Sequence, residues 1–132
     1  MEFLLALPLV LMLMAGIFEF GRHYYTRLTL RNAVAEAARF AVTGGALVDP
    51  QTGQPMTRAN SILQVVVTRA RDLNVDVNQI RLEPPDGGQP GQVLSIRATY
   101  RYQFVLAPVA QFFGPGFVDF TVATSVLNEP VF

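Results

Sequence analysis

Residues 3–18 read FLLALPLVLMLMAGIF, sixteen consecutive positions without a charge. As an α-helix this stretch is about 24 Å long, at about 1.5 Å per residue. A membrane span usually needs about 17–25 apolar residues, and the flanking Met1 and Phe20 bring the stretch to that threshold. Because apolar side chains avoid water, the stretch predicts a helix surrounded by lipid or by other apolar helices.

The stretch does not have the pattern of a secretory signal peptide. Such a peptide begins with basic residues and ends with small residues before a cleavage site. Here an acidic residue, Glu2, precedes the stretch, and Glu19 and Arg22 follow it directly. The sequence therefore favours a segment that stays in the working protein.

Two residues inside the apolar stretch weaken a helix. Pro8 lacks a backbone donor and crowds the preceding turn, and Gly16 lowers helix propensity by about 1 kcal/mol relative to alanine. In lipid, such positions survive where neighbouring groups satisfy the freed backbone atoms. Pro8 and Gly16 are therefore either tolerated kinks or a hinge that bends when subunits pack together.

The helical pattern continues beyond the apolar stretch to about residue 43. Apolar residues recur three or four positions apart at Leu30, Val34, Ala37 and Ala41, which is helical spacing. A pair of glycines at residues 44–45 then provides a helix stop. The whole helix would be about 65 Å long, much longer than a bilayer is thick, so its second half must lie in water or against partners.

The remaining residues predict a small mixed domain. Thr57 is a candidate N-cap for a second helix over residues 58–73, with one apolar stripe. Alternating apolar residues then predict strands at about 79–83, 92–106 and 117–127. We expect an α+β fold with a long N-terminal apolar helix, a second helix and a three-stranded antiparallel sheet. The expected division is an apolar helix at 1–20, an amphipathic continuation at 21–43 and a head at 44–132.

The composition argues against several function classes. Ten basic and ten acidic residues give no net charge, and the arginines are scattered, which disfavours a nucleic-acid partner. The absence of cysteine excludes disulfides and thiolate chemistry. The single histidine, His23, lies at the end of the apolar stretch, where an interfacial role is expected. We therefore expect no catalytic residue, no cofactor and no metal ligand, and no enzymatic activity.

Charged and aromatic residues at the two ends of the apolar stretch are the candidate functional residues. Glu2 either lies at the headgroup level in water or pairs with the N-terminal amine of another subunit, which would fix the register between subunits. Glu19 and Arg22 are three residues apart and form either a local pair at the membrane boundary or a clamp between subunits. Tyr24 and Tyr25 fit an interfacial aromatic belt or packing between neighbouring helices.

Three segments carry a family resemblance. Residues 2–8 (EFLLALP) resemble the "EFAL-x-LP" opening of the TadE/TadG-like pseudopilins of tight-adherence (Tad) pili. Residues 16–22 (GIFEFGR) resemble their "G-x-x-EFGR" motif, and residues 31–42 (RNAVAEAARFAV) resemble their "QNA-x-x-EAARYAV" helix. The resemblance covers the first third of the chain, while the remainder matches only in layout.

The resemblance implies a type IV pilin-like structural subunit. Such proteins enter the inner membrane by the Sec route, are cleaved by a prepilin peptidase, and join many copies of themselves in an extracellular filament with the help of other pilus-assembly proteins. Glu2 matches the early glutamate that neutralises a neighbour's N-terminal amine in type IV pilins. That glutamate is usually the fifth mature residue, so either Met1 is not the mature terminus or cleavage differs here.

The resulting candidate interface is a set of residues in the first 25 positions, with no catalytic, cofactor or metal site. These residues are Met1, Glu2, Phe3, Pro8, Gly16, Glu19, Arg22, Tyr24 and Tyr25. The alternative interpretation is a single-span membrane-anchored periplasmic protein whose head is a scaffolding or binding module. In that case the apolar helix serves as an anchor alone.

Overall fold

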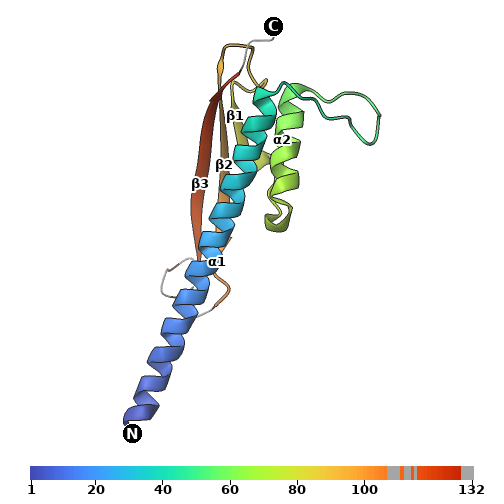
Figure 1. The fold of residues 1–132 in the computed structure, drawn as a ribbon. Coiled ribbons are helices and arrows are strands. Elements are labelled where there is room, and N and C mark those ends of the chain that lie inside the picture. The colour runs from blue at the N-terminus through green and yellow to red at the C-terminus, as the bar shows by residue number, and fades with distance from the viewer. Residues whose placement is uncertain (107–110, 112–113, 115, 129–132) are drawn as a thin grey trace. The chain divides into compact units, whose positions relative to one another are not determined.

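The computed structural model describes residues 1–106, 111, 114 and 116–128. Two helices are followed by two short 3₁₀ turns and three strands (Figure 1). In order along the chain, these are α1 (Glu2–Val42), α2 (Arg58–Arg69), η1 (Arg71–Leu73), η2 (Val77–Gln79), β1 (Ile80–Glu83), β2 (Val93–Gln103) and β3 (Phe117–Leu127). The strands form one antiparallel sheet in the order β1-β2-β3, so the expected α+β fold class is confirmed.

The element boundaries differ from the sequence-based ones at three places. Helix α2 ends at Arg69, and the residues expected to continue it form the 3₁₀ turn η1, which Asn74 closes in the left-handed conformation at φ 52°. The turn η2 was not expected, although Asp76 and Gln79 form a capping box around it. Strand β2 ends at Gln103, three residues early, because the chain bends at residues 105 and 106.

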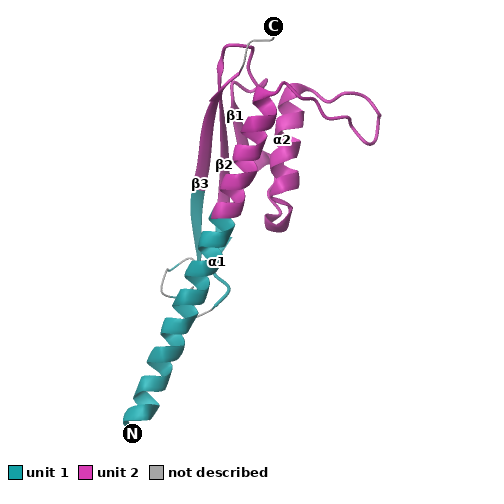
Figure 2. Cartoon of the chain, in the orientation of Figure 1, with its two compact units in different colours: residues 1–27, 101–120 teal, residues 28–100, 121–132 magenta. Residues whose placement is uncertain are grey.

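The chain divides into two compact units, which Figure 2 colours separately. Unit 1 comprises residues 1–27 and 101–120, and unit 2 comprises residues 28–100 and 121–132. Unit 1 therefore holds the first part of α1 with the end of β2 and the start of β3. The division of the chain at residues 20 and 43 stays a prediction.

Unit 2 contains a hydrophobic core between helices and sheet. Along β2, buried Leu94, Ile96 and Ala98 alternate with more exposed residues, so one face of the sheet is covered and the other faces solvent. The helices contribute one buried apolar stripe each, and the buried apolar residues of α1, α2 and the C-cap of α2 are Leu30, Ala33, Val34, Ala37, Ala38, Ala41, Ile62, Val66 and Ala70.

Arg58 connects three segments of unit 2 that are distant in sequence. Its guanidinium donates hydrogen bonds to the carbonyl oxygen of Ala41 at 2.8 Å, to the carbonyl oxygen of Gly87 at 3.0 Å and to Oδ1 of Asn128 at 2.9 Å. The bond to Ala41 places a cation at the C-terminal end of α1, where the helix dipole favours it. Asn128 is itself 2% exposed and donates to the carbonyl oxygens of Gly87 and Gln89.

We predict that Arg58→Ala lowers the free energy of unfolding by about 2–3 kcal/mol, because it removes charge-assisted bonds and leaves the Oδ1 atom of the buried Asn128 without its donor. Chemical denaturation of the full chain in detergent, followed by circular dichroism, measures this change. Arg71→Ala is the matched control, since Arg71 is exposed. Equal losses for the two variants would contradict the role given to Arg58.

Candidate assembly surface and its anchor

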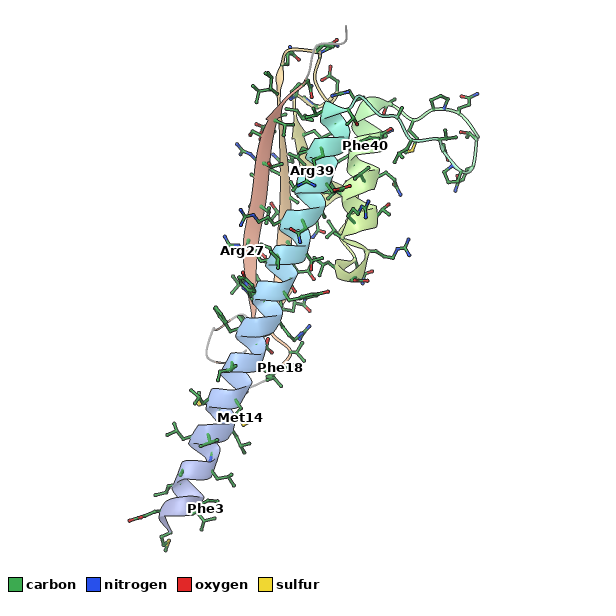
Figure 3. All side chains as sticks on the ribbon, viewed as in Figure 1. Phe3, Met14, Phe18, Arg27, Arg39 and Phe40 are labelled. Atoms are coloured by element: carbon green, nitrogen blue, oxygen red, sulfur yellow. The ribbon has the colours of Figure 1, made fainter. Side chains whose placement is uncertain are left out.

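Residues 3–18 of α1 present apolar side chains outward instead of burying them. Phe3 is 79% exposed and Leu5 80% exposed. Figure 3 shows side chains leaving this part of the helix in several directions, with Phe3, Met14 and Phe18 labelled. Helix α1 is long and apolar enough to cross a membrane, and 6% of its apolar 18-residue window is buried. A core helix of a soluble protein would be mostly buried, so this segment has the properties of a membrane-anchoring helix.

A shallow apolar pocket lies along one side of this segment. We call it the apolar groove, and its lining residues are Leu9, Val10, Met12, Leu13, Gly16, Ile17 and Phe20. A Cβ atom built on Gly16 would meet no atom within 4 Å, so the glycine leaves open space there. An open apolar groove on a helix has a shape that a second apolar side chain or a lipid chain can fill.

The helix is continuous through both of its helix-weakening residues. Pro8 lies inside α1, and the α-helical conformation extends without interruption through Gly16. Whether these positions bend when subunits pack stays a prediction. Glu2 is the first residue of α1 and is exposed, so its carboxylate lies at the helix end where the dipole favours negative charge. Met1 is fully exposed beside it.

Glu19 marks the end of the exposed apolar segment, and its side chain is buried at 2% exposure. The backbone N–H groups of Val105 and Leu106 donate hydrogen bonds to its Oε1 atom at 2.7 and 2.6 Å. The hydroxyl of Tyr102 donates to its Oε2 atom at 2.8 Å. Three donors from a segment more than 80 residues away therefore hold one carboxylate, which offsets the cost of burying it.

This arrangement joins helix α1 to the end of strand β2 within unit 1, and we call it the Glu19 anchor (Glu19, Tyr102, Val105 and Leu106). Val105 and Leu106 follow the last strand residue, so their N–H groups have left the sheet ladder and need other acceptors. Glu19 supplies that acceptor. The anchor thus explains both why β2 ends early and why a carboxylate can be buried beside an apolar segment.

The local Glu19–Arg22 pair inferred from the spacing is absent from the ion pairs of the described residues. Arg22 instead lies over the ring of Tyr102, with its guanidinium carbon 5.9 Å from the ring centroid. Both oxygens of Glu19 are already bonded within the same chain. In a single copy the Glu19 carboxylate therefore connects two segments of the same chain, and Arg22 lies beside Tyr102 in this anchor.

His23 contributes an aromatic contact to the same region. Its ring makes edge-to-face contacts with Tyr102 at 5.1 Å and with Phe120 at 5.3 Å between centroids. Such contacts contribute about 0.5–1.5 kcal/mol each in protein interiors. Among the described residues, no group of three or more acidic or histidine side chains is placed to hold a metal ion.

A second polar contact joins the two strand ends of unit 1. Arg101 on β2 donates to both carboxylate oxygens of Asp119 on β3, at 2.9 and 3.3 Å. These hydrogen bonds and the Asp119 charge raise the pKa of Arg101 above its usual value. The guanidinium carbon of Arg101 also lies over the Phe117 ring, 4.1 Å from its centroid. The pair aligns β2 and β3 close to the Glu19 anchor.

The other residues predicted for the interface lie on the exposed surface of α1 just past the anchor. Tyr24 is 59% exposed and Tyr25 is 61% exposed. The structure thus gathers Glu19 and Arg22 around Tyr102, and it keeps Glu2 at the opposite end of the apolar segment. The sequence pattern does not point to Tyr102, Val105 and Leu106 as functional residues. The one sequence signal for them is Glu19 itself, because a carboxylate next to an apolar segment needs hydrogen-bond donors from elsewhere in the chain.

The N-terminal part of the chain matches a known protein family. Residues 1–39 match the family model described as TadE-like protein. The N-terminal segment is TadE-like. The match confirms the resemblance found from the motifs, and with the apolar helix it fits a pseudopilin related to the Tad pilus. No curated protein and no solved structure matches the chain.

We predict that Glu19→Ala lowers the free energy of unfolding by about 2–4 kcal/mol, because two backbone donors and the Tyr102 hydroxyl lose a charged acceptor. Hydrogen exchange of the Val105 and Leu106 amides should become fast in the same variant. The matched control is Glu36→Ala, since Glu36 forms a 3.4 Å surface ion pair with Arg69 and such pairs contribute about 0–1 kcal/mol. Unchanged amide protection in Glu19→Ala would contradict the anchor.

Proposed function

We propose that the chain is a structural subunit, a pilin or pseudopilin, of an extracellular bacterial filament of the type IV pilus-like Tad class. The observation that carries the proposal is the exposed apolar segment at residues 3–18 of α1. In the inner membrane, lipid would surround this segment, and in the filament other copies of the same helix would. Burial of apolar surface supplies the driving force in both settings.

The apolar groove supports a packing role for the segment. In lipid, helices associate where small residues allow close approach, because lipid chains are as apolar as the side chains. Gly16 creates such a place at the middle of the groove. Copies that pack at the groove gain more van der Waals contacts than lipid chains would provide there, because lipid chains fill the groove less completely.

The Glu19 anchor supports separate roles for the apolar helix, which would pack against other copies, and for the head, which would face outward. In a filament held together by contacts between apolar helices, each head is connected to the filament through its own helix, so helix and head need a firm connection. The hydrogen bonds of Glu19 fasten the 101–106 segment to α1 directly after the apolar residues. The head would then form the outer shell while residues 1–18 form the inner bundle.

The second candidate function is a single-span membrane-anchored periplasmic protein with a scaffolding or binding head. The same apolar helix supports it, because such a helix is long enough to anchor the chain. The two functions differ in what surrounds the helix. A filament requires contacts between copies, whereas an anchor requires lipid alone.

We predict that Glu2→Ala reduces the yield of filaments sheared from the cell surface while leaving membrane insertion and the circular dichroism spectrum unchanged. The reason is that an acidic residue near the end of an apolar segment can set the register between copies by pairing with a neighbour's amine. Electron microscopy and immunoblotting of the sheared material measure the yield. Glu36→Ala is the control, as a carboxylate on the same helix far from the apolar segment.

Filament yield equal to wild type in Glu2→Ala would contradict the pairing role. If wild-type cells carry the chain only in the inner membrane, with no fibre that contains it, the anchor function replaces the filament function.

A further inference from the structure

An exposed set of aromatic and basic side chains follows the apolar segment on α1. We call it the exit belt, and its residues are Phe20, Arg22, Tyr24, Tyr25 and Arg27. Phe20 is 73% exposed, and Tyr24, Tyr25 and Arg27 are also exposed, while Arg22 is half-buried. Figure 3 shows Arg27 farther along the helix than Phe18.

The exit belt carries two arginines and no acidic side chain. Glu19 is buried and bonded to Tyr102, Val105 and Leu106. Asp119 is paired with Arg101. Neither Arg22 nor Arg27 has a carboxylate within 4.0 Å among the described residues. Arg22 still interacts electrostatically with the buried Glu19 carboxylate, so Arg27 is the guanidinium that is open to an anionic partner.

The position of the belt corresponds to the headgroup layer of a bilayer. If Phe20 marks the edge of the hydrocarbon, residues 22–27 lie about 3–10 Å farther along the helix. The headgroup layer is about 5–8 Å thick on each side. The Cα–Cβ bonds of an α-helix tilt toward its N-terminus, so the long side chain of Arg27 can reach that layer. Exposed tyrosines prefer the same depth.

We propose that the exit belt binds the phosphate headgroups of anionic phospholipids while the chain is in the membrane. This inference rests on the proposed membrane stage of the function, and it names the lipid class. A second copy at the same depth would bring arginines against arginines, which is unfavourable. Anionic headgroups instead complement the belt in charge, and each arginine near such a surface contributes about 1 kcal/mol.

The test uses the full chain in nanodiscs that contain equal amounts of phosphatidylglycerol and phosphatidylcholine. Native mass spectrometry of the released protein measures which lipid stays bound. We expect preferential retention of phosphatidylglycerol, and Arg27→Gln should reduce that preference about fivefold. The matched control is Arg39→Gln, an exposed arginine on the same helix about 28 Å past Phe20, which should leave the preference unchanged.

Equal retention of the two lipids by the wild-type protein would overturn the inference, and so would an equal loss in Arg27→Gln and Arg39→Gln. Displacement of the bound lipid by inorganic phosphate at constant ionic strength would also overturn it, because the belt would then be a site for soluble anions. Failure of the chain to enter these nanodiscs would overturn the membrane stage as well. A preference for phosphatidylglycerol in a chain that forms no filament would support the inference and count against the filament alone.

Discussion

The rest of the structure depends on one constraint, the exposure of a charge-free apolar helix that a single copy leaves uncovered. Residues 3–18 carry no charge, and large side chains along them are about half to four-fifths exposed. Water is a poor solvent for such a surface. The segment therefore requires lipid or other copies around it.

Glu19 is the residue at which the environment of α1 changes. Before it, side chains of the helix are exposed and apolar. After it, Thr26 and Leu30 are buried, and the helix supplies one face of the core in unit 2. The anchor shows how a charge can occupy this boundary. Its carboxylate accepts hydrogen bonds from the N–H groups of Val105 and Leu106, which lie beyond the end of β2. The buried charge thus gains donors, and the N–H groups that no longer pair with another strand gain an acceptor.

The sequence predicted the elements well because each has a strong periodic signal. The apolar run and its helical continuation define α1, and strict alternation predicted β3 at its observed bounds. Local pattern could not predict interactions between distant segments. The i, i+3 spacing of Glu19 and Arg22 favoured a local pair, whereas the structure satisfies Glu19 with Tyr102 and two backbone N–H groups about 85 positions away. The Arg58 contacts to Ala41, Gly87 and Asn128 were hidden for the same reason.

The most direct test of assembly through the apolar helix uses the absence of cysteine from the chain. A single Leu13→Cys substitution places one thiol in the apolar groove, and a water-soluble maleimide is then added to material sheared from the cell surface. The account predicts slow labelling of the thiol in the intact material and fast labelling after denaturation in guanidinium chloride, because neighbouring copies cover the groove. Labelling of the intact material as fast as that of the denatured chain would contradict it.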